Sequence, residues 1–86
     1  MLMTLEEFTR IQTELDTRLG YETTMYACNI RDLGENVFSY DFDAIVRVTV
    51  VFGADGSITE YVEGHTNTYA NLEEYKAAMI KNIEEF

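Results

Sequence analysis

Residues 37–52 alternate between apolar and polar side chains, and this pattern constrains the fold more than any other part of the chain. A repeat of two residues is the period of a β-strand, in which successive side chains point to opposite faces. The odd positions are mostly polar, so the pattern predicts a sheet with one face in a core. The eight even positions are all apolar: Phe38, Tyr40, Phe42, Ala44, Val46, Val48, Val50 and Phe52.

A single straight strand over these residues would be too long for the molecule. Residues 37–52 would span roughly 53 Å at about 3.3 Å per residue. A compact chain of this size has a diameter of only about 30 Å. The strand must therefore bend or break, most simply at 41–43, because Asp is depleted in strand interiors. We expect burial of Phe38, Phe42, Val46, Val48 and Val50, and exposure of Asp41, Asp43 and Arg47.

Two amphipathic helices are predicted at the ends of the chain. The first helix is predicted to run from about residue 5 to residue 19, and Thr4 forms a capping box at its start. Gly20 can adopt the left-handed conformation that ends helices. Asn71 caps the second, from 72 to about 85. Both carry apolar residues at spacings of three and four, which indicates one buried face on each helix.

The remaining segments complete the expected order. Residues 21–30 are predicted to form a strand and residues 31–36 a turn. Asp55 and Gly56 give the signature of a hairpin turn. Residues 57–63 return as another strand, and residues 64–70 are predicted to be a loop.

These elements predict one α+β domain over residues 1–86. It has two layers, with an antiparallel meander of three or four strands between an N-terminal and a C-terminal helix. Two helices that precede and follow one meander pack most simply on one face of it. The other sheet face would then be open to solvent or to a partner.

The charge balance excludes several classes of function. The chain has sixteen acidic and six basic residues, which gives a formal net charge of −10. This argues against binding nucleic acid directly and against docking on an anionic membrane, because both need Lys and Arg. No apolar run has the 18 or so residues of a membrane span, and the first residues lack the basic and apolar regions of a secretory signal, so we expect none. One cysteine, Cys28, excludes an internal disulfide, so we expect a cytoplasmic protein.

Candidate catalytic and metal-binding residues are sparse. Asp41 and Asp43 could share a proton, or hold a cation with Glu63, but a polar solvent face explains them more simply. His65, the single histidine, is expected on the surface. Cys28 is expected to be a small core side chain. No phosphate-binding, nucleophile-elbow or zinc motif is present, so we expect neither enzymatic activity nor a cofactor.

The acids are unevenly distributed along the chain. Residues 32–63 hold seven acids and one base, Arg47. Such a field would steer a basic partner and speed association. It would equally serve solubility and protect sheet edges, and the sequence leaves both explanations open. Tyr61, expected to be exposed beside acids and aliphatic residues, has the character of an interface residue.

The resulting hypothesis is a binding protein that occupies the basic surface of a nucleic-acid-handling protein, with acidic side chains in place of phosphates. Phage and plasmid inhibitors of host defence, including anti-CRISPR proteins, are an analogy of class. The alternatives are an accessory or assembly domain that dimerises through the open sheet face, and an immunity protein for a basic toxin. The residues expected to contact the partner are Asp32, Glu35, Asp41, Asp43, Ile45, Asp55, Tyr61 and Glu63.

Overall fold

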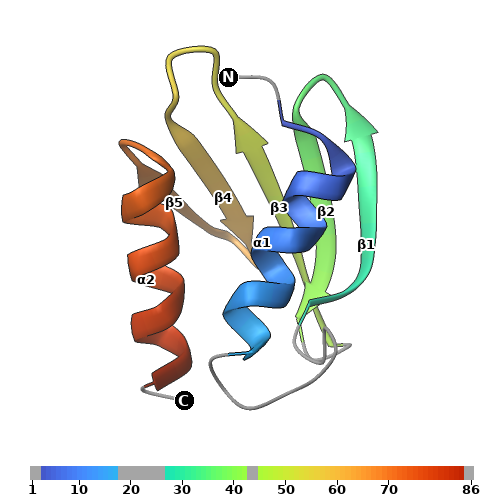
Figure 1. Cartoon of the computed structure of the whole chain (residues 1–86), viewed down its shortest axis with the longest axis vertical. Coiled ribbons are helices and arrows are strands. Elements are labelled where there is room, and N and C mark those ends of the chain that lie inside the picture. The colour runs from blue at the N-terminus through green and yellow to red at the C-terminus, as the bar shows by residue number, and fades with distance from the viewer. Residues whose placement is uncertain (1–2, 18–26, 43–44, 85–86) are drawn as a thin grey trace.

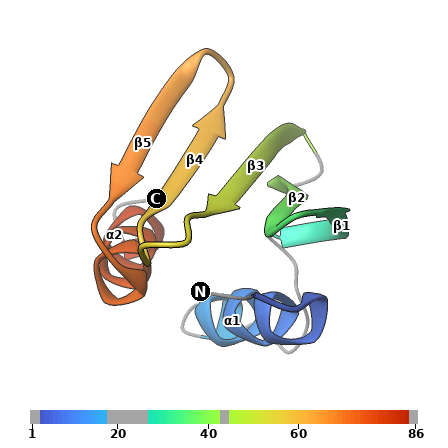
Figure 2. The same ribbon diagram turned by 90° about the horizontal axis from the view of Figure 1, so that it is seen from above.

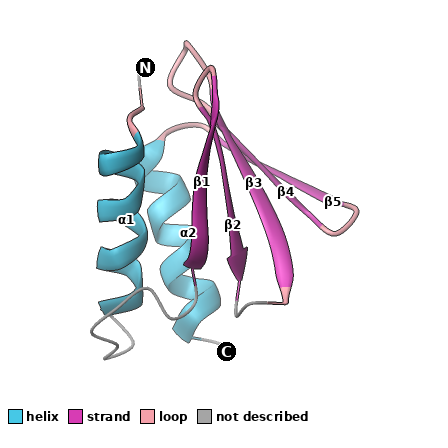
Figure 3. Cartoon of the chain, turned by 90° about the vertical axis from the view of Figure 1, so that its right-hand side faces the viewer, coloured by secondary structure: helices cyan, strands magenta, loops and turns pink. Residues whose placement is uncertain are grey.

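The computed structural model describes residues 3–17, 27–42 and 45–84, which form a five-stranded antiparallel sheet with two helices on one face (Figure 1, Figure 3). This confirms the predicted α+β meander with terminal helices, with five strands in place of three or four. The strands lie in chain order across the sheet. The elements are α1 (Leu5–Thr17), β1 (Ala27–Gly34), β2 (Val37–Phe42), β3 (Val46–Phe52), β4 (Ile58–Val62), β5 (His65–Tyr69) and α2 (Leu72–Glu84).

Both helices begin at the predicted caps. The Thr4 hydroxyl accepts a hydrogen bond from the Glu7 amide at 3.1 Å, and the Asn71 side chain accepts one from the Glu74 amide at 2.9 Å. Each bond satisfies an amide that the helix itself leaves without a partner. Gly20, predicted to end the first helix, lies outside the described residues. No helix in the described part of the chain is long and apolar enough to cross a membrane.

The long alternating segment breaks as predicted, but after Phe42 rather than at 41–43, because Asp41 and Phe42 still pair with Arg47 and Val46 of β3. β2 ends at Phe42 and β3 begins at Val46, and the Ile45 amide donates to the Phe42 carbonyl at 3.1 Å. Phe38 lies opposite Val50 in the register of the two strands. The even positions of both strands therefore share the face that the helices cover.

The loop predicted over residues 64–70 is wrong, because this segment forms β5. Glu63 and Gly64 make a two-residue turn with positive φ values of 35° and 82°. Two positive φ values suit a tight hairpin. Tyr69 at the end of β5 then pairs with Ile58 at the start of β4. Backbone hydrogen bonding to a neighbouring strand makes this polar sequence a strand, although its side chains carry little hydrophobic signal.

The first strand also lies later than predicted. A strand over residues 21–30 and a turn over 31–36 were expected, whereas β1 continues to Gly34 and leaves a two-residue turn. Gly34 has a φ of 87°, as its place beside a turn requires. Asn29 has a φ of 54° where the register with β2 shifts, which is typical of a β-bulge. Residues 21–26 lie outside the described part of the chain.

The core lies between the sheet and the helices (Figure 2). Phe38 and Val50 are buried as predicted, while Phe42 and Val46 are half-buried. These two lie where β2 and β3 meet, at an end of the sheet that borders a cavity. Leu5, on the predicted apolar stripe of the first helix, is exposed. The buried apolar residues are Met3, Phe8, Ile11, Leu15, Ala27, Phe38, Tyr40, Val48, Val50, Phe52, Ile58, Tyr75 and Met79.

The facing of β3 can be tested with two neighbouring residues. Val48 is 3% exposed, whereas the Arg47 side chain is 64% exposed. Val48→Ala should lower the free energy of unfolding by about 1–3 kcal/mol, through lost burial and a cavity. Arg47→Ala should cost less, which urea denaturation of both variants would measure. A larger loss for Arg47→Ala would show that the two faces are reversed.

Candidate functional site

Asp41 lies at the centre of a charged cluster on the sheet face opposite the helices. Its Oδ2 accepts hydrogen bonds from Asn29 Nδ2 and Arg31 Nη2, both at 3.0 Å. Its Oδ1 accepts one from Arg47 Nε at 3.1 Å. The side chain is 15% exposed, so the prediction that Asp41 is exposed is wrong. Two guanidinium groups balance this carboxylate, and the cluster adds no net negative charge to the open face.

The cluster predicts a particular response to acid. Hydrogen bonds from Asn29, Arg31 and Arg47 lower the pKa of Asp41 from 3.8 to about 2. A pKa lowered by folding stabilises the protein above the unfolded value, and this contribution is lost as pH falls from about 4 towards 2. The difference in unfolding free energy between wild type and Asp41→Asn should therefore shrink across that range. Urea midpoints at several pH values would measure it, and a constant difference would contradict the prediction.

The other predicted contact residues do not form one patch. Tyr61 is 48% exposed and lies on the open sheet face, where it pairs with Thr49. Ile45 is 79% exposed in the β2–β3 turn, and Glu63 is exposed in the β4–β5 turn. These two turns lie at one end of the meander. Asp43 lies outside the described residues, so its predicted role stays a prediction.

The remaining three predicted residues lie at the other end. Asp32 and Glu35 lie at the β1–β2 turn, and Asp55 in the β3–β4 turn. Both helices also begin at this end (Figure 1). The Met3 amide donates to Asn36 Oδ1 at 3.0 Å, which ties the start of α1 to the β1–β2 turn.

We call this region the acidic end. It holds seven acidic side chains at the helix starts and the two turns, against two bases, Arg10 and Lys76, among the described residues there. Arg10 forms an ion pair with Glu7. The acidic end therefore concentrates negative charge that the open sheet face lacks. Its members are Glu6, Glu7, Asp32, Glu35, Asp55, Glu73 and Glu74.

Local structure explains why several of these acids are there. Asp32 Oδ1 accepts from the Gly34 amide at 2.9 Å, and Asp55 Oδ1 accepts from the Ser57 amide at 3.0 Å and its hydroxyl at 2.6 Å. The hydrogen bonds from Ser57 lower the pKa of Asp55. Acids in the first turn of a helix are also stabilised by the helix dipole. Turns and helix starts meet at one end, so their acids gather there.

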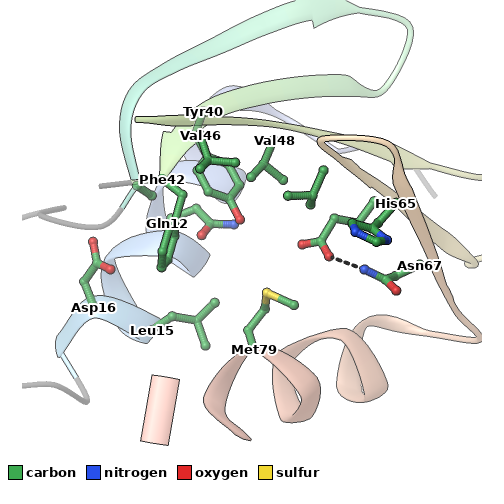
Figure 4. Close-up of a pocket in the computed structure, with 13 residues that line it drawn as sticks. Gln12, Leu15, Asp16, Tyr40, Phe42, Val46, Val48, His65, Asn67 and Met79 are labelled. Carbon is green, nitrogen blue, oxygen red and sulfur yellow. Dashed lines mark hydrogen bonds between the residues drawn. The ribbon is translucent and has the colours of Figure 1, made fainter. Parts of the chain in front are cut away.

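A cavity of about 430 Å³ lies between the sheet and the two helices (Figure 4). Its walls are mainly apolar and come from both helices and all five strands. Gln12, Asp16, Tyr40, His65 and Asn67 add polar atoms. The lining residues are Gln12, Leu15, Asp16, Ala27, Tyr40, Phe42, Val46, Val48, Glu60, Val62, His65, Asn67 and Met79.

Glu60 is the most unusual residue of the cavity, because it is an acid on the core face of β4. It is 4% exposed and lies between Val50 and Asn67 in the sheet register. Its Oε1 accepts hydrogen bonds from Asn67 Nδ2 at 3.2 Å and from the Tyr69 hydroxyl at 3.3 Å. Burial raises the pKa of Glu60, although these two bonds lower it in part.

A second polar group lies deeper under the sheet. Gln12 Nε2 donates to the Tyr75 hydroxyl at 2.9 Å, and the Tyr40 hydroxyl also hydrogen-bonds Tyr75. Burial raises the pKa of Tyr40 and of Tyr75. Both tyrosines therefore stay neutral at ordinary pH and act as hydrogen-bonding groups in the core.

The polar residues of the cavity were missed because their side chains do not suggest a buried position. Glu60 was one of the seven acids counted in residues 32–63, yet it alternates with Ile58 and Val62, which share its face. Asp16 is 2% exposed and follows Gln12 by four residues, so both lie on the inner face of α1. The helical period of α1 and the strand period of β4, extended across polar positions, would have predicted that Gln12, Asp16 and Glu60 face the core.

The two residues considered for catalysis lie apart from each other. His65 is exposed on β5, yet it also lines the cavity. Cys28 is half-buried on β1, where its thiol donates to the Asp41 carbonyl at 3.2 Å, so its predicted place in the core is wrong. Tyr69 is half-buried and packs against Tyr75. Across residues 3–17, 27–42 and 45–84, no three His, Cys, Asp or Glu side chains are grouped to hold a metal ion.

Comparison of the chain with known proteins gives no indication of its function. No protein-family model, curated protein or solved structure matches the chain.

Proposed function

We propose that this protein is a non-enzymatic binding protein whose acidic end occupies the basic surface of a nucleic-acid-handling protein. The observation that carries the proposal is the separation of charge in the fold. Seven acids gather at the acidic end against Arg10 and Lys76, whereas Asp41 on the open face is balanced by two arginines. A basic partner would be attracted to the acidic end.

The mechanism is steric and electrostatic. Negative side chains that replace phosphates speed encounter with a basic groove and leave it blocked after docking. The turns that carry Asp32 and Asp55 are held by hydrogen bonds. These carboxylates are therefore ordered before binding, which reduces the entropy lost on association. An inhibitor of host defence from a phage or plasmid, active in the cytoplasm, is the class that this mechanism suits.

A second candidate function is self-association through the open sheet face. Tyr61 is 48% exposed on this face, and Val37 and Val51 pair there without a covering helix. A dimer formed in this way would leave the acidic end free. Sizing of the purified chain separates the two candidates, because the first predicts a monomer whose elution volume does not change when Tyr61 is replaced by Ser.

Capture from an extract of cells that naturally contain the protein tests the first candidate. The matched baits are wild type, Glu35→Lys with Glu73→Lys, and Glu14→Lys with Glu63→Lys. Both double variants have the same net charge, but the second pair lies outside the acidic end. Basic proteins should be retained by wild type and by the second variant, elute with rising salt, and be lost from the first variant. Equal retention by both variants would refute the proposed surface.

A further inference from the structure

We propose that the cavity under the sheet binds a small organic cation, with an ammonium group facing Glu60 and an apolar body between Leu15, Val48 and Met79. This is a second binding activity, separate from the proposed partner contact at the acidic end. The cavity residues come from α1 after its second turn, from Met79 of α2, and from the strands around the end of the meander that holds the β2–β3 and β4–β5 turns. A ligand there would leave the acidic end accessible.

Charge defines the ligand class. Glu60 is an acid in this lining and is only 4% exposed. The described lining includes no Lys or Arg. Burying a carboxylate without an opposite charge is costly, and an ammonium group inside the cavity would supply that charge.

The hydrogen bonds of Glu60 leave room for such a group. Both partners, Asn67 and Tyr69, are neutral donors, and both bind Oε1. Among the described residues, Oε2 accepts no hydrogen bond, so it can accept one from a ligand N–H. The Tyr40 and Gln12 side chains point into the same region (Figure 4). Their oxygen atoms offer further acceptors to an ammonium group.

The rest of the lining fits an apolar body. The side chains of Leu15, Val46, Val48, Val62 and Met79 form the walls. A volume of about 430 Å³ falls in the usual range for small-molecule sites, which are mostly apolar with a few placed polar groups. Phe42 adds an aromatic ring, which attracts a cation through its face.

Three probes of one shape separate charge from apolar contact: 4-phenylbutylamine, 4-phenylbutanol and 4-phenylbutyrate. Binding to the full chain would be measured by calorimetry, and the site by NMR shifts of the Leu15, Val48 and Met79 methyl groups. Glu60→Gln keeps an oxygen that can accept from Asn67 and Tyr69, and it removes the charge. Glu63→Gln is the matched control, because it removes an exposed charge from the same hairpin.

The amine should bind wild type at least about tenfold more tightly than the alcohol, which corresponds to a hydrogen bond to a charged group, and the carboxylate should not bind. Glu60→Gln should weaken the amine about tenfold or more and leave the alcohol unchanged, while Glu63→Gln matches wild type. If Glu60→Gln does not fold, Val62→Trp, which fills the cavity, should abolish binding of both ligands. Equal affinities for amine and alcohol, equal losses in both Glu variants, or no methyl shifts would overturn the proposal.

Discussion

Replacing Phe8 with alanine is expected to lower the free energy of unfolding by about 3–5 kcal/mol. Phe8 is fully buried at the centre of the core. Its ring stacks on Phe38 with centroids 4.8 Å apart and meets Phe52 edge-on at 5.9 Å. Truncation removes these contacts and leaves a cavity that close-packed neighbours fill only in part. A domain of this length has a total stability of only about 4–13 kcal/mol, so this single change removes a large part of it.

Leu5 on the same helix provides the control. Its side chain is 41% exposed, so Leu5→Ala should change stability far less than Phe8→Ala. Urea denaturation followed by far-UV circular dichroism would compare the two variants with wild type. Similar losses for both would mean that α1 packs with a different face against the sheet.

The parts of the fold that local patterns specify strongly were predicted well. Alternation over residues 37–52 identified the face of β2 and β3 that enters the core, and chain length required the break after Phe42. The helix caps at Thr4 and Asn71 are equally local, since each is one side chain bonded to an amide three residues on. Patterns of this kind need no information about distant partners.

Other features depend on distant partners and were therefore missed. β5 is polar and becomes a strand through hydrogen bonds to β4. Asp41 was expected to face solvent, but Arg31 from a neighbouring strand and Arg47 from another enclose it. The sequence alone gives no register between β1 and β2, so this pairing could not be derived. The burial of Glu60 likewise depends on where α2 packs.

The candidate site was predicted in part for the same reason. Asp32, Glu35 and Asp55 were proposed from net charge along the chain, and the meander brings their turns to one end. The acids in the first turns of the helices, such as Glu6 and Glu73, were left out, because only the three-dimensional arrangement brings the helix starts to the same end as those turns (Figure 1). Tyr61 and Glu63 were predicted as contacts of the same partner because they were expected on the open face, but they lie elsewhere in the meander.

Reversing two charges at the acidic end is expected to slow association with a basic partner at least about tenfold at low salt. Glu35 and Glu73 suit this change because, among the described residues, neither takes part in a hydrogen bond or ion pair, and both are exposed. Their replacement by Lys should therefore leave the fold intact. The dissociation rate should change less, because exposed charges at the edge of an interface act mainly on encounter.

The association rate with the purified partner, measured at low and high salt for wild type and both double-lysine variants, tests the central claim most directly. Steering by the acidic end predicts that Glu35→Lys with Glu73→Lys slows association strongly, while Glu14→Lys with Glu63→Lys has a smaller effect. The difference in association rate between the two variants should become smaller at high salt. At about 0.15 M, salt already screens interactions between exposed charges that lie more than roughly 8 Å apart. If both variants slow association equally at every salt concentration, net charge alone drives the encounter, and the acidic end is not the binding surface.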